Sequence, residues 1–175
     1  MNTHSDASNL PPSASNNPPE SKVDTFVRQD VLTRVAPLSL RWVLGLTMLS
    51  AVADRFGLWD PPGTTNVSWG DWSHFVAYTA KVNSFLPGAL APALAIMATV
   101  AELLLGVALI LGVFCRQVAL ASATLLTLFA IAMTWSFGIK APLNFSVFVD
   151  AAAALVLSAW PVTTVRKSTV ANGRI

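Results

Sequence analysis

Long stretches of apolar residues alternate with short polar segments along this chain. The apolar stretches cover about residues 38–58, 90–114, 116–137 and 142–160. Each has roughly the 20 residues that an α-helix needs to cross the hydrocarbon core of a membrane. Because lipid offers no hydrogen-bond partners to free backbone groups, such segments must be helices. The pattern therefore predicts an all-α fold, a four-helix transmembrane bundle whose membrane domain covers residues 38–160.

The two ends of the chain have a different pattern. Residues 1–21 are rich in Ser, Asn and Pro and carry few large apolar side chains, which predicts a disordered tail. In residues 22–37, apolar residues recur at helical spacing with charged residues between them, which predicts an amphipathic helix lying on the membrane surface. Residues 161–175 follow the last apolar stretch and are expected to form a C-terminal tail.

The longest connection, residues 59–89, lies between the first two predicted spans. Its Pro-Pro-Gly sequence, beginning at Pro61, stops the first helix. Further along, Trp69, Trp72 and His74 belong to an aromatic-rich segment, and amphipathic aromatic rings favour the boundary between membrane and water. We expect a short interfacial helix here, on the periplasmic side, with these three residues covering the end of the bundle.

Composition and charge agree with a membrane protein. Only 11% of the residues are charged and 54% are hydrophobic, against roughly 25% charged residues in an average soluble domain. The net charge of +2 provides no strongly basic surface, so we expect no nucleic-acid partner. Most Lys and Arg residues fall before the first span, between the second and third, or after the fourth. By the positive-inside rule this places both termini in the cytoplasm of a cell whose inner membrane holds the protein. Three basic residues fall on the other side: Arg55, Lys81 and Lys140.

Few residues are suited to metal or thiol chemistry. Cys115 is the only cysteine, so the chain cannot form an internal disulfide or a CxxC redox pair, and a second thiol would have to come from a partner. The two histidines, His4 and His74, have no other ligand-type residue at metal-binding spacing, so no metal site is expected. The sequence also has no glycine-rich phosphate loop and no GxSxG motif.

One acidic residue stands within the second apolar stretch. On a helical wheel, Glu102 shares a face with the small or polar residues Ala95, Thr99 and Gly106, while bulky aliphatic residues occupy the opposite face. Membrane helices pack closely through small side chains and turn their bulky face to lipid. We therefore expect Glu102 to point into the bundle.

The other three spans also place polar residues on one face. The fourth carries Asp150 among small residues, the third carries Thr124 and Thr127, and the first carries Arg41 and Arg55. Ionisable groups inside a membrane commonly mark a ligand site or an ion pathway. These residues, together with Glu102, are our candidates for a polar core that binds a ligand.

Depth along each helix predicts which of these groups can meet. At ~1.5 Å per residue, Glu102 lies roughly 18 Å from the outer end of its span, Asp150 roughly 12 Å and Arg55 about 5 Å. Arg55 is therefore expected to pair with Asp150. Arg41 lies close to the opposite membrane face and is marginal for Glu102, so Glu102 is expected to have no cationic partner.

A buried carboxyl group without a cation favours its protonated form. We expect Glu102 to be neutral and hydrogen-bonded to Thr124 or Thr127 on the third span, or to Asp150. In a functional interpretation, Glu102 exchanges a proton with a ligand. In the alternative interpretation, it holds the helices in register, for which measured interhelical hydrogen bonds contribute on the order of 1 kcal/mol or less.

Residues 101–120, AELLLGVALILGVFCRQVAL, resemble the central signature of the DoxX family of small bacterial membrane proteins. In that family a Glu opens a glycine-containing apolar run and an Arg follows in the turn to the third helix. The matching positions here are Glu102, Gly106, Gly112 and Arg116. The segments LRWVLGLTMLSAVADRFGLW and FGIKAPLNFSVF are similar to the first helix and to the approach to the fourth, so the resemblance covers roughly residues 38–160.

The resemblance implies a four-helix bundle in the bacterial inner membrane. Relatives include the small subunit of a thiosulfate:quinone oxidoreductase and proteins proposed to scaffold oxidative-stress enzymes. Because this chain has one cysteine, electron transfer would need a bound quinone or a partner subunit. We expect the polar core to bind a small hydrophobic ligand such as a quinone. Two alternatives stay open, a non-catalytic subunit that recruits a soluble oxidoreductase and a small proton-coupled transporter.

Overall fold

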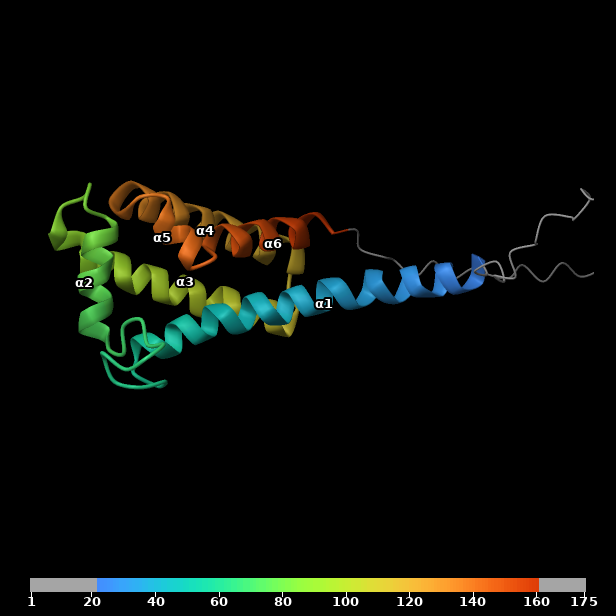
Figure 1. Ribbon diagram of the computed structural model, residues 1–175, viewed down its shortest axis with the longest axis horizontal. Coiled ribbons are helices and arrows are strands. Elements are labelled where there is room, and N and C mark those ends of the chain that lie inside the picture. The colour runs from blue at the N-terminus through green and yellow to red at the C-terminus, as the bar shows by residue number, and fades with distance from the viewer. Residues whose placement is uncertain (1–21, 161–175) are drawn as a thin grey trace, which may run out of the picture. The chain divides into compact units, whose positions relative to one another are not determined.

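The described part of the chain is helical throughout. The structure, a computed structural model, describes residues 22–160, with side chains from residue 31 onward, and contains no strand within that range. The predicted tails, residues 1–21 and 161–175, lie outside the described residues. The helices are α1 (Lys22–Arg55), α2 (Trp72–Val82), the 3-10 helix η1 (Gly88–Leu90), α3 (Ala91–Leu111), α4 (Cys115–Phe137), α5 (Lys140–Asn144) and α6 (Val147–Ala159) (Figure 1).

The chain divides into two units, Met1–Arg34 and Val35–Ile175. The second unit holds the bundle. Helix α1 begins in the first unit and continues through Pro37, so the expected boundary between residues 22–37 and the first span is not a break in the helix. The membrane-surface location of residues 22–37 stays a prediction.

Three of the four expected spans have the length and composition needed to cross a membrane. These are Val31–Arg55, Gly88–Leu111 and Cys115–Phe137. The fourth, predicted as one span over 142–160, is instead divided into α5 and α6. The chain turns at Ser146, whose φ is 57°, and α6 has 13 residues, or ~20 Å of helix. The all-α bundle is confirmed, with a fourth helix shorter than a full crossing.

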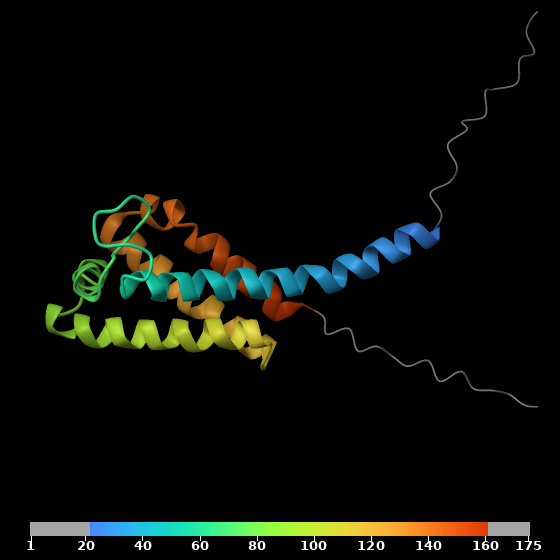
Figure 2. The same ribbon diagram turned by 90° about the horizontal axis from the view of Figure 1, so that it is seen from below.

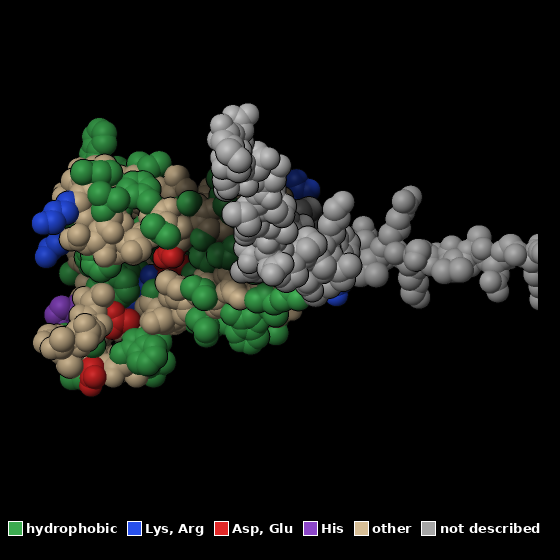
Figure 3. All heavy atoms as spheres, turned by 45° about the vertical axis from the view of Figure 1, so that its right-hand side comes forward, with side chains coloured by type: hydrophobic (Ala, Val, Ile, Leu, Met, Phe, Trp, Pro, Cys, Tyr) green, Lys and Arg blue, Asp and Glu red, His purple; other side chains and the backbone are tan. Residues whose placement is uncertain are grey.

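Small side chains line the inner face of α3, as the wheel predicts. Its buried residues include Ala95, Thr99, Glu102 and Gly106, whereas the aliphatic residues of the opposite face are exposed, and Figure 3 shows hydrophobic side chains over much of the visible surface. The buried residues of α4 and α6 are also mostly small, and include Ala119 and Ala123 of α4 and Ala151 and Ala154 of α6. The central core joins four helices and consists of Leu44, Met48, Leu109, Ala119, Ala123, Ala154 and Leu157.

Helices α1 and α3 run side by side (Figures 1 and 2), with contacts from Arg41 to Arg55 of α1. Their backbones approach closely at Gly45 and Gly106. A methyl group on Gly45 would lie 2.9 Å from the carbonyl oxygen of Gly106 and 2.7 Å from Cγ1 of Ile110. Because backbone atoms cannot move aside as a flexible side chain can, this crossing requires glycine.

We predict that Gly45→Val lowers the free energy of unfolding in detergent micelles by about 2 kcal/mol, because the added side chain forces α1 away from α3. Gly88→Val is the matched control, since nothing lies within 4 Å of a methyl group built on Gly88. Equal stability of the two variants would contradict the close approach of the two helices.

Candidate functional site

A buried ion pair joins the end of α1 to the middle of α3. Nη2 of Arg55 lies 2.6 Å from Oε2 of Glu102, and the two side chains are 3% and 5% exposed. Nη1 of Arg55 donates a hydrogen bond to Oγ1 of Thr99 at 2.9 Å. The Thr99 hydroxyl in turn donates to the carbonyl oxygen of Ala95 at 2.8 Å. The charge of Arg55 is therefore held by one carboxylate and one hydroxyl, both from the same face of α3.

The expected pairing of Arg55 with Asp150 is wrong, and so is the expectation that Glu102 has no cationic partner. That prediction placed the outer ends of all helices at one level. Helix α1 in fact ends at Arg55, which bonds Thr99, eight residues after the first residue of α3. The outer end of α3 therefore extends ~12 Å beyond the end of α1. This difference in level brings Arg55 opposite Glu102.

Aromatic rings cover the Arg55 guanidinium. Its central carbon lies 3.9 Å from the ring centroid of Phe75 and 5.3 Å from that of Trp69. The Trp69 ring also meets the rings of Phe75 and Tyr78 edge-on, at centroid distances of 5.0 and 5.7 Å. Cation–π contact is stronger where water is excluded, so these rings add to the stabilisation of the buried charge. Trp69 was expected to cap the bundle, whereas the role of Phe75 was missed.

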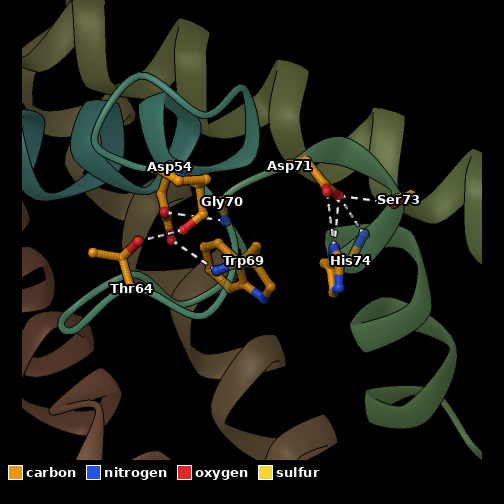
Figure 4. Close-up of polar contacts among 8 residues, drawn as sticks. Asp54, Thr64, Trp69, Gly70, Asp71, Ser73 and His74 are labelled. Atoms are coloured by element: carbon orange, nitrogen blue, oxygen red, sulfur yellow. Dashed lines mark hydrogen bonds and ion pairs between the residues drawn. The ribbon is translucent and has the colours of Figure 1, made fainter.

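Asp54 holds the loop that carries Trp69. Its carboxylate accepts hydrogen bonds from the backbone N–H groups of Ser68 at 2.9 Å, Trp69 at 3.1 Å and Gly70 at 3.4 Å. Figure 4 shows this carboxylate beside Trp69 and Gly70. Gly70 has a φ of 70°, and a methyl group on it would lie 2.5 Å from the backbone nitrogen of Pro62. The two neighbouring charged residues at the end of α1 thus have different partners. Asp54 accepts hydrogen bonds from the loop, and Arg55 binds side chains of α3.

A second polar cluster lies at the start of α2. Asp71 is the N-cap residue, and its carboxylate accepts from the backbone N–H of His74 at 2.8 Å and from the hydroxyl of Ser73 at 2.8 Å. Nδ1 of His74 lies 2.9 Å from both carboxylate oxygens (Figure 4). These hydrogen bonds, the backbone bond from His74 first, lower the pKa of Asp71 to about 2. The His74 side chain is 60% exposed, so it does not cover the ion pair.

Arg41 is bound at the other end of α3. Its Nε donates to the carbonyl oxygen of Leu109 at 3.0 Å, and its Nη2 donates to that of Ile110 at 3.2 Å. These carbonyls belong to the last turn of α3, where a cation is favoured by the helix dipole. The chain turns there at Gly112, whose φ is 75°. Arg41 is therefore a C-terminal cap of α3 and lies outside the polar centre.

The remaining candidates do not reach Glu102. The hydroxyl of Thr124 donates to the carbonyl oxygen of Leu120 at 3.0 Å, and that of Thr127 donates to the carbonyl oxygen of Ala123 at 2.7 Å. Asp150 is half-buried, and its carboxylate makes no hydrogen bond or ion pair with any residue that the structure describes. The expected hydrogen bond from Glu102 to one of these three residues is wrong, because Arg55 occupies that position.

Two open grooves lie on the surface of the bundle. The Thr99 groove has a volume of about 390 Å³ and is lined by Phe56, Trp72, Ile96, Thr99 and Val100. The Thr134 groove has a volume of about 490 Å³ and is lined by Ile131, Thr134, Trp135, Ile139 and Phe148. Thr99 is the feature that links a groove to the ion pair, because its hydroxyl accepts the hydrogen bond from Arg55.

One donor in the ion-pair cluster has no partner. Nε of Arg55 is buried and makes no hydrogen bond with the described residues. A buried N–H group without an acceptor is costly. Among the described residues, no three His, Cys, Asp or Glu side chains are grouped in a way that could hold a metal ion.

Comparison with known proteins gives one match. The family model described as DoxX matches residues 36–137, more than half of the chain. The matched range includes α2, α3 and α4 together with the part of α1 that carries Arg41 and Arg55. None of the curated proteins and none of the solved structures that were compared matches the chain.

We predict that Glu102→Gln lowers the free energy of unfolding in detergent by about 3 kcal/mol, because it leaves the buried charge of Arg55 without a counter-charge. Asp150→Asn, which removes a carboxylate that bonds no described residue, is the control and should change stability by less than about 1 kcal/mol. The double variant Arg55→Met/Glu102→Leu should recover most of the loss. If Glu102→Gln and Asp150→Asn behave alike, the ion pair does not form.

Proposed function

Because the chain belongs to the DoxX family and is a helical membrane protein, we propose that it binds a small apolar molecule with oxygen acceptors, such as a quinone. The binding site in this proposal is the Thr99 groove. The observation that carries it is that Thr99 has two contacts. It lines the groove, and its hydroxyl accepts a hydrogen bond from Arg55 of the buried ion pair. A polar centre thus lies directly behind an apolar surface groove.

The residues present fit a quinone. The groove volume of about 390 Å³ falls within the range of ~300–1,000 Å³ that is usual for small-molecule sites. The rings of Phe56 and Trp72 stack with centroids 5.9 Å apart beside it and offer flat apolar contact. The Nε–H of Arg55 is a buried donor without an acceptor. Arg55 does not line the groove, so a quinone carbonyl oxygen would reach this donor only if a side chain beside Thr99 moved aside. A bound quinone would supply two-electron redox chemistry.

In this proposal, Glu102 is a positioning residue for Arg55. The carboxylate neutralises the guanidinium and holds it under the rings of Phe75 and Trp69. The sequence-based interpretation, in which Glu102 exchanges a proton with the ligand, would require the ion pair to open first. The pairing therefore favours binding and orientation by Arg55 over proton transfer by Glu102.

A redox role would require a partner. The chain has a single cysteine, Cys115, and cannot cycle a dithiol by itself. We propose that the protein supplies a quinone site to a soluble or membrane oxidoreductase in the bacterial inner membrane. In the alternative proposal, it recruits such an enzyme without binding the quinone, and the binding experiment below separates the two.

We propose that both termini face the cytoplasm, as the distribution of Lys and Arg indicates. Ser73 is exposed at the start of α2, on the side opposite to the termini in this orientation. In a Cys115→Ser background, Ser73→Cys should react with a membrane-impermeant maleimide in intact spheroplasts. Reaction that occurs only after the membrane is permeabilised would show the reverse orientation.

Filling the groove tests the site. Val100 is 48% exposed and lines the Thr99 groove, and Ile131 is 57% exposed and lines the Thr134 groove. We predict that Val100→Trp weakens binding of a short-chain ubiquinone to the detergent-purified protein by at least about tenfold, which corresponds to ~1.4 kcal/mol. Ile131→Trp should leave binding unchanged. Isothermal titration calorimetry measures both.

Absence of ubiquinone binding to the unaltered protein would contradict the proposal and favour the recruiting role. Equal weakening by the two variants would show that the quinone does not discriminate between the grooves. Weakening by Ile131→Trp alone would move the site to the Thr134 groove. Thermal unfolding of each variant shows whether it retains its fold.

A further inference from the structure

The Thr134 groove is not used by the proposed function. It is lined by residues from the last turns of α4 and the start of α6, and by Ile139 from the connection between α4 and α5. Its walls are apolar and outward-facing, with Ile131 57%, Trp135 76% and Ile139 55% exposed. Because α4 is one of the helices long enough to cross a membrane, we expect these exposed side chains to face lipid acyl chains.

The composition of the groove is typical of the boundary between membrane and water. Trp135 is near the end of α4, and tryptophan favours the head-group region of the bilayer. On the other side of the groove, α6 begins only at Val147, after the turn at Ser146. A helix of 13 residues is ~20 Å long, less than the ~30 Å of the hydrocarbon core. A lipid molecule here would contact the apolar side chains of the groove and the turn at Ser146 before α6.

A free positive charge follows the groove directly. Lys140 is the residue after Ile139, is exposed, and forms no ion pair with any residue that the structure describes. A lysine side chain carries its charge on a flexible stem of four carbons, so its ammonium group can reach the mouth of the groove. Lys81 lies at the same end of the bundle, because the hydroxyl of Ser136 bonds the carbonyl oxygen of Val82 at 2.6 Å. Figure 3 shows basic side chains beside hydrophobic ones at the left-hand end of the molecule.

We propose that the Thr134 groove binds an anionic phospholipid. One acyl chain lies along Ile131, Trp135 and Phe148, and the phosphate group lies against the ammonium group of Lys140. Basic residues placed beside membrane helices attract anionic head groups, and the apolar groove fixes the position of the chain. A zwitterionic lipid also fits the groove, but its own cation offsets the attraction to Lys140.

Native mass spectrometry of the detergent-purified full chain tests this proposal with dioleoylphosphatidylglycerol and dioleoylphosphatidylcholine as probes. The unaltered protein should retain phosphatidylglycerol in preference to phosphatidylcholine. Lys140→Gln should weaken phosphatidylglycerol binding by about fivefold, the effect of one basic residue near a charged membrane surface. Ile131→Trp, which fills the groove, should weaken the binding of both lipids.

Two variants serve as controls. Lys81→Gln removes a charge from the same end of the bundle, and Val100→Trp fills the Thr99 groove; both should leave phosphatidylglycerol binding unchanged. Equal retention of the two lipids by the unaltered protein would overturn the proposal. Equal losses in Lys81→Gln and Lys140→Gln would also overturn it, because they would show general attraction to charge. Unchanged binding in Ile131→Trp would exclude the groove as the site of the chain.

Discussion

The architecture depends on burying the charge of Arg55. Taking a guanidinium out of water is expensive, and its cost is offset only where a counter-charge and hydrogen-bond acceptors stand in good geometry. Here the counter-charge is Glu102, the further acceptor is Thr99, and an aromatic ring lies against the guanidinium face. These partners come from α3 and α2. The contacts of the Arg55 side chain therefore fix the relative positions of α1, α2 and α3, which are separate in sequence.

This requirement also explains the shape of the connection between α1 and α2. Since α1 must stop level with Thr99, the space above its end has to be filled by the loop and by α2. Asp54 folds the loop by accepting three backbone hydrogen bonds, and the fold puts Trp69 over Arg55. Adjacent residues of opposite charge therefore act together, although they do not pair with each other in the structure.

Sequence patterns predicted the helices and their inward faces, because apolar length and the spacing of small residues are local properties. They did not predict the pairing of Arg55, because the relative level of two helix ends depends on how the loop between them folds. The break at Ser146 was missed for a related reason, since the apolar composition of residues 142–160 continues through it. Thr99 was correctly assigned to the inner face, yet its bond to Arg55 required the register between α1 and α3.

The chemistry of arginine, beyond its charge, determines how the buried site is built. A lysine at position 55 would carry its charge and all of its donors on a single nitrogen, with no flat face for an aromatic ring. The guanidinium of Arg55 uses one terminal nitrogen for Thr99, the other for Glu102 and its face for Phe75. None of these contacts involves Nε, which has no hydrogen-bond partner among the described residues. The same geometry that stabilises the charge therefore leaves one buried donor unsatisfied, which is the polar group behind Thr99 that the proposed ligand site depends on.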